Sequence, residues 1–188
     1  MRILACALLG ASLSWSTGCA REEQSVLLVL KTTQSEFFSD IHKGFSEELS
    51  KSKPDLVITV KAGEKPGDIT GQTAALDAQY GQLVAGRRQP LIRGLVLTPS
   101  SSGGDLVPQI ASYRRANIPV VLLDTSIERD QLVRANTDYN LLILSDNKAG
   151  GKLAAKVIAD ELKRRHKPCE VLLLNGNPDQ DTDRKSVV

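Results

Sequence analysis

The chain has 188 residues, a formal net charge of +2, and a composition that is 41% hydrophobic and 24% charged. Such a length provides one ordinary domain, or a lobe and a half of a two-lobed protein. The composition is that of a globular protein. The net charge is too small to indicate nucleic acid or an acidic surface as a partner.

The N-terminal residues predict export. Arg2 precedes a mainly apolar run at residues 3–13, which has the length of a signal-peptide core and is too short to span a bilayer permanently. The small residues 16–18 and the following Cys19 resemble a bacterial lipobox, in which a lipid is attached to the cysteine and the preceding peptide is removed. We therefore expect a signal peptide at residues 1–18, lipidation at Cys19, and a tether to the membrane at residues 19–24. A plain signal peptide with a coincidental cysteine is the alternative. In either case we expect the mature chain in the periplasm or the cell envelope.

From residue 25 onward, short apolar runs alternate with amphipathic segments. The runs are rich in Val, Leu and Ile and lack polar alternation, which is typical of strands buried on both faces of a parallel sheet. They lie at residues 26–30, 56–60, 94–97, 120–123, 141–144 and 171–174. This order predicts an α/β fold with a doubly wound parallel sheet.

Apolar residues at three- and four-residue steps predict helices between these strands. The first such stripe lies at residues 38–49. Asp68 and Asp105 stand where the N-caps of the second and third helices are expected. Residues 126–140 show no clear apolar period and predict an irregular connection.

Polar side chains follow the predicted strands. Ligands bind at the carboxyl ends of the strands in open parallel sheets, and here those ends include the hydroxyls, amides and carboxylates of residues 98–105, 124–126 and 145–147. A hydroxyl-rich ligand needs this mixture of donors and acceptors. Strand-to-helix turns are nevertheless polar in every α/β protein, because caps and turns require Ser, Asp and Asn. The pattern alone leaves both interpretations open.

Two adjacent aromatic residues, Phe37 and Phe38, follow the first predicted strand. Neighbouring residues on a helix cannot both face the core. Phe38 fits the apolar stripe of the first helix, so Phe37 is the better candidate for a ring that stacks on a ligand.

Signals of catalysis are weak. No dinucleotide-binding glycine motif, Walker loop, H-E-x-x-H zinc motif or G-x-S-x-G elbow occurs in the sequence. His42 and His166 fall on polar helix faces, and the basic run at residues 163–167 suits a helix C-terminus rather than nucleic acid. We expect no enzymatic activity, no metal site and no cofactor.

Several segments, taken in order, resemble the periplasmic sugar-binding family related to the ribose-binding protein. They are the two phenylalanines with the K-G-F of residues 43–45, G-L-V-L-T-P at residues 94–99, N-I-P-V-V-L-L-D at residues 117–124, and S-D-N with A-G-G within residues 145–151. The resemblance implies a type I periplasmic binding fold, in which two α/β lobes joined by a hinge close on a sugar. Lobe I would occupy residues 25–145, and residues 146–188 would begin an incomplete lobe II.

The resemblance also implies roles for individual residues. Phe37 and Phe38 would contact the sugar ring, and Asp124 would accept hydrogen bonds from its hydroxyl groups. Arg184 would clamp the sugar from the second lobe. The chain departs from the family pattern just before the phenylalanine pair, where Gln34-Ser35-Glu36 replaces a common Asn and Pro, so the sugar is not predicted.

Two further positions follow from the same resemblance. Asp146 and Asn147 stand where the family chain crosses the hinge. Residues 183–188 match one reading frame of a common sequencing adaptor, so we expect the coding sequence to end near Thr182, in which case Arg184 is not native.

The sequence thus predicts an exported lipoprotein that binds a sugar or a similar small polyhydroxy ligand and delivers it to the permease of an ABC importer. One alternative is a sensory module of the same fold that signals to a membrane receptor. Another, from a different class, is a small exported α/β enzyme.

Overall fold

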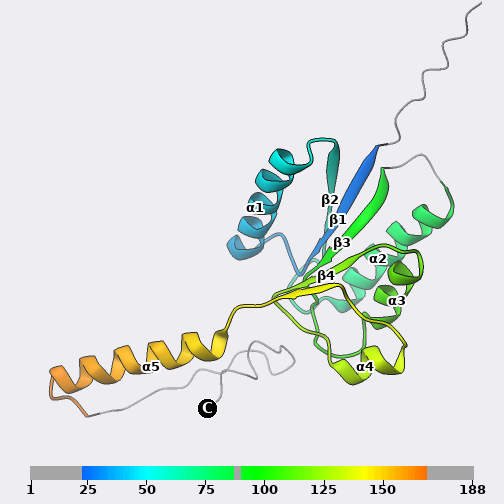
Figure 1. The fold of residues 1–188 in the computed structure, drawn as a ribbon. Coiled ribbons are helices and arrows are strands. Elements are labelled where there is room, and N and C mark those ends of the chain that lie inside the picture. Colours follow the sequence, from blue (N-terminus) through cyan, green and yellow to red (C-terminus); the bar gives the residue numbers. More distant parts are fainter. Residues whose placement is uncertain (1–22, 87–89, 169–188) are drawn as a thin grey trace, which may run out of the picture.

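The computed structural model describes residues 23–86 and 90–168, in which strands and helices alternate along the chain (Figure 1). The strands are β1 (Gln24–Leu30), β2 (Leu56–Ala62), β3 (Leu91–Leu97), β4 (Val120–Leu123) and β5 (Leu141–Ile143). The helices are α1 (Glu36–Ser52), α2 (Ile69–Val84), α3 (Val107–Arg115), α4 (Arg129–Arg134) and α5 (Asn147–Arg164).

The strands form one parallel sheet in the order β2-β1-β3-β4-β5. The chain begins in the sheet at β1, moves outward to β2, and then returns past β1 to build the other side. This reversal makes the sheet doubly wound, and ligands bind beside such a reversal in open α/β folds. The α/β class and the parallel sheet predicted from the apolar runs are confirmed.

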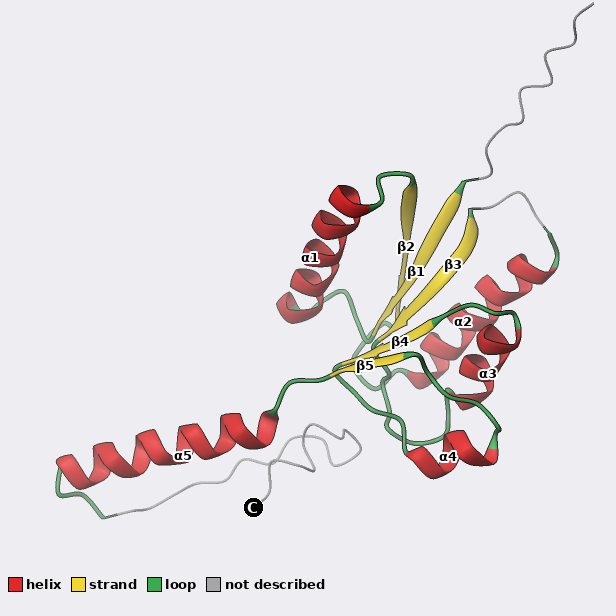
Figure 2. Ribbon diagram, viewed as in Figure 1, coloured by secondary structure: helices red, strands yellow, loops and turns green. Residues whose placement is uncertain are grey.

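Helices cover both faces of the sheet, with α1 on one face and α2, α3 and α4 on the other (Figure 2). Alternate residues of β1 enter the two cores, because successive side chains of a strand point to opposite faces. Leu27 and Val29 pack with the α2–α4 side, whereas Leu28 and Leu30 pack with Phe38 of α1.

The last helix, α5, extends away from the sheet (Figure 1). None of its residues is buried, and its apolar side chains Leu153, Val157 and Ile158 are 53–64% exposed. None of the described helices has the length and hydropathy needed to cross a membrane.

The predicted cap of the second helix is confirmed. The Asp68 carboxylate accepts hydrogen bonds from the Gly71 N–H and the Glu64 N–H, each at 2.9 Å. The predicted cap of the third helix is wrong: α3 begins after Leu106, not Asp105, and no side chain caps it. Pro108 stands in its first turn, where proline stabilises a helix start without a donor.

The expectation of an irregular connection at residues 126–140 is also wrong in part. The short helix α4 lies inside it and is anchored by Leu132, which is 2% exposed. Leu132 is the only buried residue of α4, so no apolar period could reveal the helix. Residues 1–18, Cys19, the predicted strand at 171–174 and Arg184 lie outside the described residues.

Candidate ligand-binding site

The carboxyl ends of β1, β3 and β4 meet at one edge of the sheet, because these strands are parallel neighbours. Lys31 follows β1, Thr98 follows β3 and Asp124 follows β4. The Lys31 N–H donates to Thr98 Oγ1 at 2.8 Å, and Lys31 Nζ lies 2.8 Å from Asp124 Oδ2. Residues 93 positions apart in the sequence therefore form one polar cluster.

The Lys31–Asp124 ion pair is the main electrostatic feature of this edge. The Lys31 side chain is 4% exposed and the Asp124 side chain is 20% exposed. Nζ of Lys31 also lies 5.9 Å from the centroid of the Phe38 ring, within the range of a cation–π interaction. Separating a partly buried ion pair leaves two charges without compensation, which is costly. The pair therefore holds the Lys31 and Asp124 side chains together.

Asp124 adopts a left-handed backbone conformation with a φ of 65°. This region is uncommon for residues other than glycine and is found at functional sites, although Asp and Asn tolerate it best. The conformation is held by a hydrogen bond from the Asp124 N–H to the Ile143 carbonyl of β5, at 2.9 Å. Thr125 Oγ1 joins Lys31 on Oδ2, at 3.4 Å. Among the described residues, both contacts go to Oδ2, and Oδ1 remains as the acceptor for a ligand.

The two phenylalanines have different environments, as their positions on the predicted helix require. Phe38 is 7% exposed and packs in the core under α1, whereas Phe37 is 51% exposed. The rings meet edge to face, with centroids 5.1 Å apart. Phe38 therefore contacts both the Phe37 ring and the Lys31 ammonium group. Phe37 is the one of the two rings that is exposed to solvent.

A buried glutamine of α2, Gln72, joins the carboxyl ends of β1 and β3. Gln72 of α2 is fully buried, and its Nε2 donates to the carbonyls of Leu30 and Thr98 at 3.0 and 2.9 Å. Its Oε1 accepts from the Ser100 N–H at 2.9 Å. One side chain thus ties the end of β1 to the end of β3.

Lys31 and Gln72 were not predicted as site residues from the sequence. A signal existed for each. Lys31 is a cation directly after a buried strand, at the edge where ligands bind. Gln72 is a polar residue three positions after Ile69 and four before Leu76, in the apolar stripe of the second helix.

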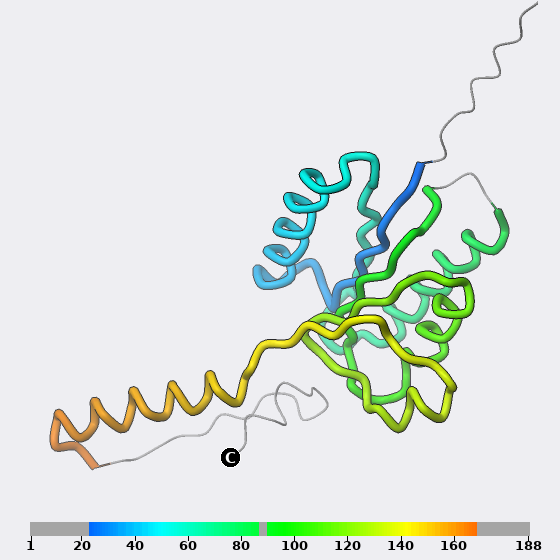
Figure 3. The backbone as a smooth tube through the Cα atoms, in the orientation of Figure 1, coloured from blue at the N-terminus to red at the C-terminus, as the bar shows by residue number. Residues whose placement is uncertain are grey.

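The chain leaves the sheet after β5 and continues into α5 (Figure 3). Asp146 caps α5, since its carboxylate accepts from the Ala149 N–H at 2.8 Å, and Asn147 is the first residue of that helix. Of the two residues expected at the hinge, Asp146 therefore ends the link between β5 and α5, and Asn147 begins α5.

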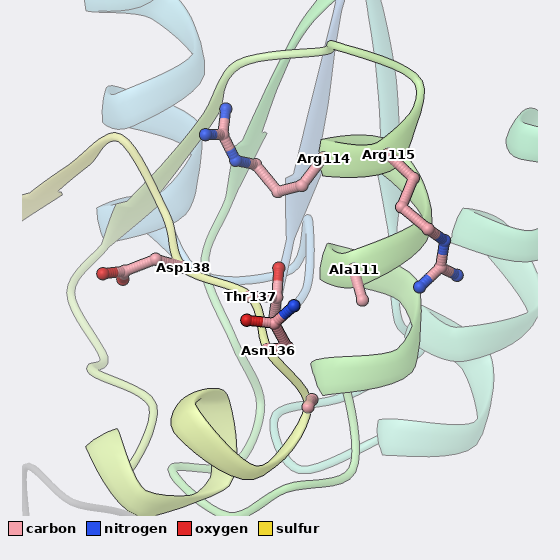
Figure 4. Close-up of a pocket in the computed structure, with 7 residues that line it drawn as sticks. Ala111, Arg114, Arg115, Asn136, Thr137 and Asp138 are labelled. Carbon is pink, nitrogen blue, oxygen red and sulfur yellow. The ribbon is translucent and has the colours of Figure 1, made fainter.

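A separate cleft of about 520 Å³ lies between the end of α3 and the turn before β5 (Figure 4). It is lined by Ala111, Arg114, Arg115, Ala135, Asn136, Thr137 and Asp138. These segments lead into the amino ends of β4 and β5, so the cleft is at the opposite end of the sheet from Lys31 and Asp124. Among residues 23–86 and 90–168, no group of three or more His, Cys, Asp or Glu side chains could hold a metal ion.

These features define an α/β fold with a polar cluster at the carboxyl ends of its parallel strands, which is where open α/β sheets bind ligands. The chain belongs to the family described as "Periplasmic binding protein domain", whose model matches residues 26–186. The family resemblance found in the sequence is thereby confirmed.

Two curated proteins and one solved structure illustrate the similarity. The chain is 26% identical over 165 residues to the ribose import binding protein RbsB of Bacillus subtilis, covering 88% of this chain and 47% of that protein. It is 28% identical over 155 residues to the D-allose-binding periplasmic protein of Escherichia coli, covering 82% and 45%. A periplasmic solute-binding protein of Actinobacillus succinogenes with bound D-allose superposes with a TM-score of 0.71 at 23% identity, over 87% of this chain and 52% of that one. The chain spans about half the length of the curated relatives it matches.

Proposed function

We propose that the chain forms the first lobe, and the start of the second, of an exported solute-binding protein that captures a sugar for an ABC importer. The observation that carries this proposal is the Asp124 carboxylate, which is held by its ion pair with Lys31 and by the backbone bond from its N–H to β5. The exposed Phe37 ring contacts Phe38, whose own ring lies 5.9 Å from Lys31 Nζ. The curated relatives support the proposal, because one is a ribose import binding protein and the other a D-allose-binding periplasmic protein.

Each side chain has a role that its geometry permits. Oδ1 of Asp124 accepts hydrogen bonds from sugar hydroxyl groups, and the exposed Phe37 ring stacks on the C–H face of the sugar. Phe38 contributes the edge of its ring and holds Phe37 in place.

The second lobe provides the rest of the site in this proposal. Residues 25–145 form lobe I, and lobe II begins at residue 146, with the hinge at Asp146 and Asn147. Arg184, if native, clamps the sugar from lobe II. Closure follows from contacts that both lobes make with the sugar, since a ligand shifts a conformational equilibrium only through its preference for one state.

Export and anchoring complete the proposal. The D-allose-binding relative is a periplasmic protein, which supports a function outside the cytoplasm, and Cys19 is the proposed lipid attachment site. Mass spectrometry of the membrane fraction tests this: a diacylglycerol-modified Cys19 at the mature N-terminus supports the anchor, and an unmodified Cys19 contradicts it.

Isothermal titration calorimetry of the full-length protein with D-ribose, D-allose and other pentoses and hexoses tests sugar capture. We expect at least one sugar to bind with a micromolar or lower dissociation constant and without turnover. Asp124→Asn should weaken this binding by about tenfold or more. Asp138→Asn, in the cleft at the other end of the sheet, is the matched control and should bind as the parent does. A protein that binds no sugar, or that consumes one, contradicts the proposal.

A further inference from the structure

Lys31 is a buried cation in direct contact with the carboxylate that we propose for ligand binding. Its side chain is 4% exposed, and its Nζ lies 2.8 Å from Asp124 Oδ2. An ammonium group carries three N–H donors, so the contact with Asp124 uses one and two remain for other acceptors. The Phe38 ring, 5.9 Å from Nζ, favours a positive charge at this place.

The pair changes the charge that a ligand meets. An unpaired carboxylate attracts cationic groups, but here Lys31 already occupies the position of the cation. An ammonium group of a ligand placed against Asp124 would lie beside a like charge, which offsets its attraction to the carboxylate. It would also lose its hydration, and a buried charge without compensation is costly.

A hydroxyl group meets no such conflict. It can donate its hydrogen to Oδ1 of Asp124 and accept a hydrogen bond from Lys31 with its oxygen, because a hydroxyl is both a donor and an acceptor. Hydrogen bonds to charged partners are stronger than those between neutral groups. The same two side chains therefore favour a neutral polyol and disfavour its aminated analogue.

We infer that Lys31 is a specificity-determining residue that makes this site select neutral sugars over amino sugars. The inference rests on the proposed function and names the ligand class of the same site. It also assigns Lys31 a positioning role, since the ion pair holds the Asp124 carboxylate in a single orientation.

The test compares the sugar that binds most tightly in the titration panel with its 2-amino-2-deoxy counterpart, using the full-length protein at neutral pH. We expect the parent protein to prefer the neutral sugar by at least about tenfold. Lys31→Met, which keeps an unbranched side chain and removes the charge, should lower this preference by at least about tenfold, by strengthening the binding of the amino sugar relative to that of the neutral sugar. Lys31→Gln, which keeps a donor for Asp124, should act in the same direction and serves if the methionine variant is unstable.

Lys61→Met is the matched control, because Lys61 is exposed near the end of the edge strand β2. It should leave the preference unchanged. Two results would overturn the inference while leaving sugar capture intact: a parent protein that binds both ligands equally, or Lys31 variants that weaken both by the same factor. If no sugar binds at all, the proposed function fails, and the inference fails with it.

Discussion

Replacing Gln72 by leucine removes the side chain that joins the ends of β1 and β3. Gln72 is fully buried and makes three hydrogen bonds to backbone groups, with the Leu30 carbonyl, the Thr98 carbonyl and the Ser100 N–H. Leucine has a similar size, so the change removes hydrogen bonds without opening a large cavity. The backbone groups remain buried.

The expected cost follows from those groups. The Leu30 carbonyl still accepts a hydrogen bond from the Gly63 N–H, at 3.4 Å. The Thr98 carbonyl and the Ser100 N–H, in contrast, lose their hydrogen bonds with Gln72. An unsatisfied buried polar group costs about 1–3 kcal/mol, and the apolar leucine recovers part of that by burial. We therefore expect the free energy of unfolding to fall by about 2–4 kcal/mol.

Urea unfolding followed by far-ultraviolet circular dichroism measures this loss. The midpoint should fall while the dependence on urea stays the same, since the surface exposed on unfolding does not change. Gln82→Leu, on the same helix, is the control and should change stability by less than about 0.5 kcal/mol. If Gln72→Leu costs no more than Gln82→Leu, the hydrogen bonds of Gln72 do not stabilise the strand ends and the reasoning is refuted.

Three further predictions concern single side chains. Phe37→Ala should weaken sugar binding with little effect on stability, because the ring is half exposed, whereas Phe38→Ala should lower the free energy of unfolding by about 3–5 kcal/mol; equal effects of the two on thermal unfolding would contradict this. The N–H groups of Glu64 and Gly71 hold the pKa of the Asp68 carboxyl below its ordinary value of 3.8. The stability that Asp68 contributes is therefore fully present above pH 3.8 and is lost as the pH falls through the lower pKa of the folded state. An NMR titration that shows an Asp68 pKa at or above 3.8 in the folded protein would contradict this. Burial raises the pKa of Tyr113 above its ordinary value of 10.0. The stability that Tyr113 contributes is therefore present below pH 10.0 and is lost as the pH rises further. Ultraviolet titration should show that Tyr113 ionises only as the protein unfolds, and ionisation of Tyr113 in the folded protein would contradict the raised pKa.

Much of the fold could be predicted because its signals are local. Continuous apolar runs such as residues 120–123 indicate a strand without any knowledge of its neighbours. Asp68 could be recognised as a cap because a helix start needs an acceptor within three residues. Leu132 shows the limit of such signals, because it is the only buried residue of α4 and a single apolar position makes no period. The helix α4 was therefore not predicted.

The candidate site could be predicted only in part, because its contacts are not local. Asp124 follows a recognisable strand, but its partner Lys31 is 93 positions away, and their contact depends on the strand order β1-β3-β4. No sequence period encodes that order. The left-handed conformation of Asp124 depends in turn on β5 lying beside β4, through the carbonyl of Ile143.

The hydrogen bond from the Asp124 N–H to the Ile143 carbonyl connects the proposed ligand site to the segment that leads to the proposed hinge. The Asp124 N–H is bound to the carbonyl of Ile143, the last residue of β5, and Asp146 caps α5 three positions later. The carboxylate that we propose for sugar binding is therefore fixed to the strand that leads out of the proposed lobe I. Any rotation that closes the two lobes must begin after Ile143, since an earlier pivot would break this bond and move Asp124. A hinge at Asp146 and Asn147 satisfies this condition, because it lets the second lobe move while the polar cluster of the first keeps its shape.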